Sequence, residues 1–292
     1  MTPSRSEFLT IRGLRTHVRH WGREGAPILF MSHGWMDMSA SFQFVVDHLQ
    51  GDWHVIANDW RGFGLSERSH SDTYWFPDYV ADLDALLAHY SPDAPVNLLG
   101  HSMGGNVVSM YAGVRPERVK KLINLEGIGL VGAKPEQAPK RMAKWLDELR
   151  TPPVMRAYAS LDEVAARLQK TNPRLPTERA AFLAEHWSAR NDAGEYESLG
   201  DPAHKMPGPL LYHLDEVIAM WKRISAPVLW IEAAQTEMWR WMGLQEEMRA
   251  EVDRRLAHMA SVEPHIVAEA GHMVHHDQPE VLARLIEAFL AK

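Results

Sequence analysis

The chain has 292 residues, of which 46% are hydrophobic, so it is long enough to bury a sizeable core in one large domain or two smaller ones. Its 38 acidic and 31 basic residues give a net charge of −7 without a basic stripe, which argues against a nucleic-acid partner. Cysteine is absent, which excludes disulfides, thiol catalysis and thiolate metal sites.

Short β-rich runs alternate with helical segments along most of the chain, which is typical of an α/β fold with a mostly parallel sheet. The first two runs, at residues 8–12 and 16–21, flank Gly13 and predict an antiparallel pair. The later runs are continuously apolar, as expected for strands buried on both faces, and cover residues 27–32, 54–59, 96–101, 122–126, 227–233 and 265–270. Helices are predicted between them at residues 79–89, 104–114 and 280–290.

Residues 129–224, here called the insert, interrupt this alternation with helical patterns only. Ser160 and Glu163 match a capping box, and Thr177 is the expected cap of the next helix. We expect the insert to form a helical cap over the site, on a core domain of residues 1–128 and 225–292. The helices expected in the insert cover residues 135–149, 161–169, 177–189 and 210–222.

The strongest chemical signal is a G-x-S-x-G motif at residues 100–104, between an expected strand and an expected helix. In this context Ser102 sits on a sharp turn, where only small neighbours allow the strained backbone that exposes the hydroxyl. The first turn of the following helix directs free N–H groups at developing negative charge. We expect Ser102 to be a nucleophile and the backbone N–H of Met103 to be an oxyanion donor.

A second signal is His272, which follows the last expected strand about 20 residues before the C-terminus. Histidine is largely neutral near pH 7 and can accept a serine proton, so we expect His272 to be the general base. The neighbouring His275, His276 and Asp277 suggest a metal cluster at first inspection. We interpret them instead as residues that cap and pack the last helix, and we predict no metal.

A third signal is the end of the strand at residues 27–32, which leads into His33-Gly34-Trp35. The backbone N–H that follows this strand can point into the site. We therefore expect Trp35 to supply the second oxyanion donor.

Taken together, these motifs resemble the α/β-hydrolase fold along nearly the whole chain. The matching segments are residues 33–35, 59–67, 100–104 and 271–272. The resemblance implies an eight-stranded sheet with helices on both faces and an inserted helical lid. Within the family, the chain is similar to the branch that contains haloalkane dehalogenases, epoxide hydrolases and serine-hydrolase-like esterases.

The nucleophile separates this chain from two activities of that branch. Dehalogenases and epoxide hydrolases use an aspartate at the elbow, and water releases the product by attacking the ester carbonyl of the alkylated carboxylate. Alkylation of a serine would give an ether, which has no carbonyl that water can attack to release the product. With Ser102 at this position, we set both activities aside.

A triad also needs a carboxylate that holds the histidine tautomer and stabilises its cation. The family usually places it after the seventh strand in a pattern like Gly-x-x-Asp, where this chain has Ala233 and Thr236. We prefer Glu126, at the end of the sixth strand, because some dehalogenases that resemble this chain carry their acid there. Glu237, one residue beyond the usual position, is the alternative, and Glu232 is the third choice.

These expectations describe acyl transfer to water by a serine hydrolase that acts on a small to medium carboxylic ester or lactone without a cofactor. The alternatives are C–C bond hydrolysis of a vinylogous ketone, cofactor-free perhydrolysis and, from another class, a ligand-binding receptor with little turnover. The residues expected to line the substrate pocket are His33, Gly34, Asp37, Tyr158, Trp187 and Tyr212.

The surroundings of the protein follow from the same sequence. It has no apolar leader, and no apolar stretch approaches the roughly 18 residues of a membrane span. We expect a cytoplasmic monomer or homodimer with a small-molecule substrate and no membrane or nucleic-acid partner.

Overall fold

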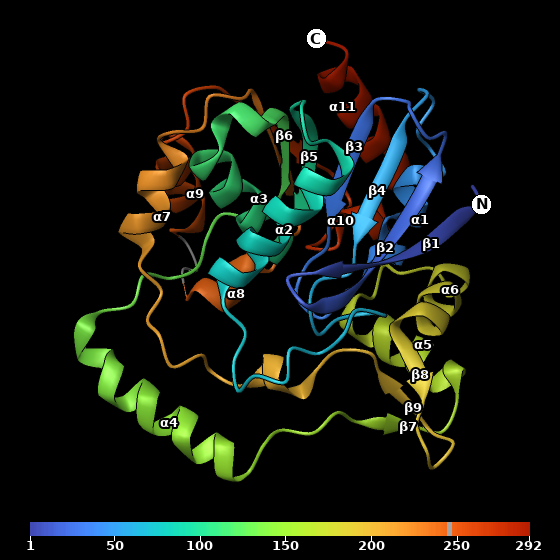
Figure 1. Cartoon of the computed structure of the whole chain (residues 1–292), viewed down its shortest axis with the longest axis vertical. Helices are drawn as coiled ribbons and strands as arrows, with labels where there is room; N and C mark the ends of the chain where they lie inside the picture. Colours follow the sequence, from blue (N-terminus) through green and yellow to red (C-terminus); the bar gives the residue numbers. More distant parts are fainter. Residues whose placement is uncertain (244–246) are drawn as a thin grey trace.

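The computed structural model describes residues 1–243 and 247–292. Its centre is an eight-stranded sheet in the order β1-β2-β4-β3-β5-β6-β10-β11 (Figure 1). β2 pairs antiparallel with β1 and β4, and the other neighbours are parallel, so the expected α/β fold is confirmed. The strands are β1 (Ser4–Ile11), β2 (Leu14–Gly22), β3 (Ile28–Ser32), β4 (His54–Asn58), β5 (Val96–His101), β6 (Val119–Leu125), β10 (Val228–Ala233) and β11 (Val262–Val267).

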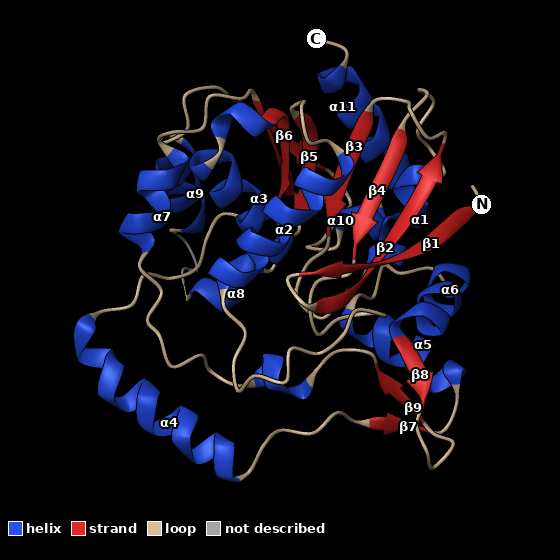
Figure 2. Ribbon diagram, viewed as in Figure 1, coloured by secondary structure: helices blue, strands red, loops and turns tan. Residues whose placement is uncertain are grey.

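Helices cover both faces of this sheet, as Figure 2 shows, because the central strands are apolar on both sides. Phe30 of β3 packs into the core shared with α2 (Phe76–Tyr90) and α3 (Met103–Val114). Its neighbours Leu29 and Met31 pack into the core on the opposite face. That core includes residues of α1 (Gln43–Val46) and α11 (Pro279–Leu290).

The remaining elements outside the insert are short. They are η1 (Ser39–Phe42) and η2 (Pro116–Arg118), both 3₁₀ helices, and the α-helices α8 (Met238–Met242), α9 (Met248–Leu256) and α10 (Val274–Asp277). Within the part of the chain that the structure describes, no helix has the length and apolar character to cross a membrane.

The insert leaves the sheet after β6 and returns to it before β10. The prediction that it contains only helices is wrong, because three strands form an antiparallel sheet in the order β7-β9-β8. Strands of two or three residues are too short to show the alternation by which a strand is predicted. The elements of the insert are η3 (Pro135–Gln137), α4 (Ala138–Arg150), β7 (Ala157–Tyr158), α5 (Leu161–Thr171), α6 (Thr177–Trp187), β8 (Ser188–Arg190), β9 (Tyr196–Ser198), η4 (Pro202–Lys205) and α7 (Leu214–Trp221).

The predicted capping box at the start of α5 is present. Ser160 Oγ accepts the N–H of Glu163 at 3.2 Å, and the Glu163 carboxylate accepts the N–H of Ala159 at 3.1 Å. The expected cap of α6 differs, since Thr177 is its first helical residue and Pro176 occupies the cap position. Likewise α7 begins four residues later than expected, at Leu214 rather than residue 210, because the segment before it is rich in proline and glycine.

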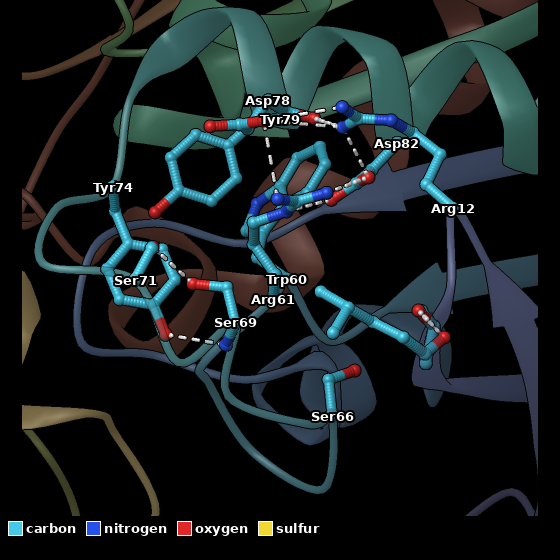
Figure 3. A network of polar contacts seen from close by, with 12 residues as sticks. Arg12, Trp60, Arg61, Ser66, Ser69, Ser71, Tyr74, Asp78, Tyr79 and Asp82 are labelled. Atoms are coloured by element: carbon cyan, nitrogen blue, oxygen red, sulfur yellow. Dashed lines mark hydrogen bonds and ion pairs between the residues drawn. The ribbon is translucent and has the colours of Figure 1, made fainter.

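An arginine network holds the loop after β4 to α2 (Figure 3). Arg61 donates from Nε and Nη2 to the two carboxylate oxygens of Asp82, at 2.6 Å each. Arg12 donates to the same carboxylate at 3.0 Å. Arg61 therefore stabilises this loop, because its guanidinium is bound to α2.

The insert docks on the same loop through η4. The N–H of Asp201 donates to Gly62 O at 2.7 Å, and the Tyr74 hydroxyl donates to the Asp201 carboxylate at 2.8 Å. The ring of His204 lies between those of Phe63 and Tyr74, with centroid distances of 3.7 Å on both sides. Burial lowers the pKa of His204 to about 3, so the ring is neutral near pH 7.

This docking predicts a specific loss of stability in acid. The pKa of His204 is 6.5 in an ordinary environment and about 3 in the folded chain, so below pH 6.5 the unfolded state binds a proton that the folded state excludes. The stability contributed by the neutral ring is complete above that pH and is lost as the pH falls toward the folded pKa. We expect His204→Phe to show a smaller loss of Tm than wild type between about pH 7.5 and about pH 5, measured by circular dichroism. Equal losses in the two proteins would contradict this prediction.

Candidate active site

Ser102 lies in the sharp turn between β5 and α3, with φ of +50° and ψ of −113°. This backbone conformation is unfavourable for a residue with a side chain, and it persists because its surroundings hold it. The glycines of the motif are required by close packing. A Cβ on Gly100 would lie 2.4 Å from Gly104 O, and a Cβ on Gly104 would lie 2.2 Å from Ser32 O. The turn therefore presents Ser102 in front of the first turn of α3.

His272 lies in the loop after β11 and approaches Ser102. Its Nε2 is 2.9 Å from Ser102 Oγ, and its side chain is 14% exposed. Two hydrogen bonds hold the loop from behind. The Asp277 carboxylate accepts the N–H of Gly271 at 2.8 Å, and His101 Nε2 donates to His272 O at 2.8 Å. They fix the imidazole in the direction of the serine hydroxyl.

Glu126 follows β6 and reaches the other nitrogen of this imidazole. Its Oε2 lies 2.6 Å from His272 Nδ1, and its side chain is fully buried. Its Oε1 accepts the N–H of Ala233 at 2.7 Å, while Oε2 also accepts the hydroxyl of Thr236 at 2.9 Å. These donors compensate the buried carboxylate charge. The arrangement directs Nδ1–H to Glu126 and leaves Nε2 as the acceptor for the Ser102 proton.

The other two candidate acids lie elsewhere. Glu237 is exposed and pairs with Arg240 at 2.9 Å, and Glu232 pairs with Arg249 at 2.5 Å. Thr236, at the position where the resemblance predicts an aspartate, donates a hydrogen bond to Glu126 instead. Of the three carboxylates considered, Glu126 is the one beside the imidazole.

The turn after β3 lies directly against Ser102. A Cβ on Gly34 would be 3.2 Å from Ser102 Cβ, so the backbone of residues 34 and 35 is adjacent to the nucleophile. Met103 is the first residue of α3, where backbone N–H groups have no partner within the helix. The side chain of Trp35 is 53% exposed, and its indole donates to His204 O at 3.3 Å. The backbone of Trp35 and that of Met103 thus flank the serine from two elements.

Four of the expected pocket residues are buried, although Asp37 borders a small hollow that Trp187 also lines. His33 is fully buried and accepts a backbone N–H of the loop after β4 at 3.0 Å. Asp37 is buried and accepts the hydroxyl of Ser41 at 2.8 Å. Tyr158 packs within the insert, and Tyr212 packs against the core on the α2 side. His33 and Asp37 were selected because they neighbour the turn after β3 in sequence, and Tyr158 and Tyr212 as aromatic residues of the insert. Packing buries all four side chains.

The described surface of the insert instead exposes aliphatic side chains that the sequence reasoning did not select. Trp187, a predicted pocket residue, is half-buried and donates its indole N–H to Met36 O at 2.8 Å, which ties α6 to the turn after β3. Met142 and Leu146 of α4 are one helical turn apart and both exposed. Their spacing of four residues places them on one face of a helix, and this pattern is visible in the sequence. The exposed aliphatic residues of the insert are Leu130, Val131, Met142, Leu146, Val154 and Leu210.

A second feature missed from the sequence is the brace between the insert and the catalytic loops. The segment between α5 and α6 carries Asn172, whose amide donates to the Asp277 carboxylate at 2.7 Å. Arg174 in the same segment donates from Nε to Gln235 at 2.9 Å. The insert thus contacts both the loop of His272 and the loop of Thr236. Isolated polar residues in a loop have no sequence pattern that predicts such contacts.

Comparison with known proteins gives a consistent result. A sequence model of the alpha/beta hydrolase fold matches residues 27–279. A serine hydrolase-like protein of Danio rerio is 26% identical over 92% of this chain and 83% of its own length. A 3-hydroxybutyrate-oligomer hydrolase of Cupriavidus necator is 28% identical over 89% of this chain and 88% of its own. The solved structure of a thioesterase domain from the curacin biosynthetic pathway has the same fold, with a TM-score of 0.86 and 24% identity over 98% of this chain and 99% of that one.

Proposed function

The chain belongs to the α/β-hydrolase fold family, and on this premise we propose that it is a serine hydrolase that cleaves a small to medium carboxylic ester or lactone. The observation that carries the proposal is the continuous hydrogen-bonded arrangement of Glu126, His272 and Ser102. A nucleophile in contact with a base, and a base oriented by a buried carboxylate, is the arrangement that acyl transfer requires.

The first half of the reaction forms an acyl-enzyme. Ser102 Oγ attacks the substrate carbonyl carbon while His272 Nε2 takes the hydroxyl proton. The carbonyl oxygen becomes an oxyanion, which the backbone N–H groups of Trp35 and Met103 stabilise. The imidazolium is stabilised by Glu126 and then gives its proton to the leaving alkoxide, so the C–O bond breaks and an alcohol departs.

The second half returns the enzyme to its starting state. A water molecule gives a proton to His272 and attacks the acyl carbon, the second oxyanion collapses, and Ser102 regains its proton as the acid leaves. For a lactone the alcohol and the acid are parts of one product. No step needs a cofactor.

Two features support an ester with an apolar part as the substrate class. The insert exposes several aliphatic side chains, including Met142 and Leu146 of α4, that an acyl or alkyl chain can contact. Two of the similar proteins are named as a thioesterase domain and as a hydrolase of 3-hydroxybutyrate oligomers. The chemistry that these two names share is acyl transfer, and this is the chemistry that we propose for the present chain.

Turnover of p-nitrophenyl esters of graded acyl length tests the proposal. We expect wild type to hydrolyse them with an optimum in chain length, and Ser102→Ala to lose at least about 10⁴-fold in kcat. The matched control is Ser4→Ala, which removes an exposed hydroxyl at the start of β1, outside the triad. Undiminished turnover in Ser102→Ala would refute the serine mechanism. A folded wild type that forms a stoichiometric adduct without turnover would indicate a receptor instead.

A further inference from the structure

Three buried side chains with metal-binding groups meet behind the nucleophile. The ligand atoms of Asp37, His101 and His275 all lie within 4.8 Å of one another. The three residues are 7%, 1% and 0% exposed, respectively. They come from three segments of the site. Asp37 lies in the turn after β3, His101 is the last residue of β5, directly before Ser102, and His275 belongs to α10, three residues after His272.

The hydrogen bonds of this group leave lone pairs without donors. His101 Nε2 donates to His272 O, so His101 Nδ1 carries a lone pair, and this nitrogen has no hydrogen-bond partner among residues 1–243 and 247–292. The Nδ1 of His275 is also buried and, over the same residues, unpartnered, so no hydrogen bond at Nδ1 opposes the tautomer in which Nε2 has the free lone pair. A Cβ on Gly34 would lie 2.8 Å from His101 Nδ1, so a glycine at this position is what leaves the nitrogen open.

The charge in the group is suited to a cation. One carboxylate and two imidazoles converge in the interior of the protein, at Asp37, His101 and His275. A charged carboxylate and neutral imidazoles are the protonation states that bind a metal ion.

We propose that Asp37, His101 and His275 bind one Zn²⁺ ion, and that the bound ion inhibits the reaction at Ser102. Two imidazole nitrogens and one carboxylate oxygen match the ligand preference of Zn²⁺, whereas Ca²⁺ and Mg²⁺ prefer oxygen ligands throughout. The Ser41 hydroxyl, 2.8 Å from Asp37 Oδ2 and 3.3 Å from His275 Nε2, is a further oxygen beside the group.

Inhibition follows from the geometry that the ion requires. Ligands of a tetrahedral Zn²⁺ lie about 3.4 Å apart, given bonds of about 2.1 Å. Asp37 Oδ2 and His275 Nε2 are already 3.4 Å apart, but the three donors together are gathered only to within 4.8 Å. Closing the group on an ion draws His101 inward, and His101 is bonded to Ser102 and holds the His272 carbonyl. A displacement of about 1 Å in such a site costs about 100-fold in rate.

Binding is tested without reference to activity. Calorimetric titration of Ser102→Ala with ZnSO₄ is expected to show one ion per chain. In the same background, His275→Gln and Asp37→Asn are each expected to weaken binding by more than about 100-fold. His265→Gln, which removes a half-buried histidine on β11, is the matched control and should bind as its parent does. Unchanged affinity in both ligand variants would overturn the proposal.

The location of the ion is tested by anomalous diffraction from Zn²⁺-soaked crystals of wild type, which does not depend on any variant folding. A peak among Asp37, His101 and His275 is expected. A peak between Glu126 and His272, with binding lost in Glu126→Gln, would place the ion on the triad and overturn the proposed site.

The inhibitory effect rests on the proposed function, so it is measured separately as ester turnover with and without Zn²⁺. We expect at least a 10-fold fall at saturation that EDTA reverses, each variant being compared with its own zinc-free rate. Binding at the site without any ester turnover would refute the proposed function but not the metal site. Binding without a change in turnover would refute the inhibition.

Discussion

Glu126→Gln is expected to lower kcat by about 10³- to 10⁴-fold, with a much smaller change in KM. The amide keeps the shape of the side chain but removes the charge that stabilises the imidazolium. It can also donate to His272 Nδ1, which would favour the tautomer that cannot accept the serine proton. Steady-state kinetics on the best p-nitrophenyl ester, together with the pH dependence of kcat/KM, measures this effect.

The matched control for this variant is Glu237→Gln. The substitution is chemically the same and lies one residue from Thr236, but Glu237 is exposed and pairs with Arg240. We expect its kcat to stay within about twofold of wild type, since a surface ion pair contributes little. If Glu237→Gln abolished turnover and Glu126→Gln did not, the acid would be misassigned.

Gly104→Ala is expected to destabilise the fold by about 3 kcal/mol or more, or to prevent folding. A Cβ at this position would lie 2.2 Å from Ser32 O and 2.6 Å from His33 O. Both atoms are backbone, at the end of a buried strand, so they cannot move aside without shifting β3 against α3. Urea unfolding followed by circular dichroism measures the change in the free energy of unfolding.

Gly208→Ala provides the comparison, because a Cβ there would meet Thr73 Oγ1 at 3.4 Å, an ordinary contact. This variant should change the free energy of unfolding by less than about 1 kcal/mol. Similar effects of the two substitutions would show that the elbow is not packed as closely as the structure indicates.

The loops of the site share a strained backbone. Among the described residues, six that are not glycine have positive φ, and four of them lie in loops of the site: Met36, Ser102, Glu126 and Glu269. Each of the four follows the end of a strand of the central sheet by one to four residues. Such conformations cost free energy and persist where the surroundings over-determine them, as the bonds of Asp277 and Thr236 do here.

Local patterns in the sequence predicted the central strands, the elbow around Ser102 and the loop of His272. These features depend on residues close together in the chain, such as apolar runs and the glycines of the motif. The same kind of reasoning failed for β7, β8 and β9, whose two or three residues carry too little pattern.

Tertiary structure alone distinguished among the three candidate carboxylates. The sequence left Glu126, Glu237 and Glu232 open because it does not state which strand end faces His272. The order β6-β10-β11 places the end of β6 beside the loop after β10, where Ala233 and Thr236 donate to Glu126 and direct it at the imidazole.

Burial was the other property that the sequence did not determine. His33, Asp37, Tyr158 and Tyr212 were expected to line the pocket from their position or type, yet their side chains are buried. Asp37 meets His101 and His275 only because the turn after β3, the end of β5 and α10 converge beside Ser102. Secondary structure follows from interactions among neighbours in the chain, whereas the direction of a side chain and its partners depend on how distant segments pack.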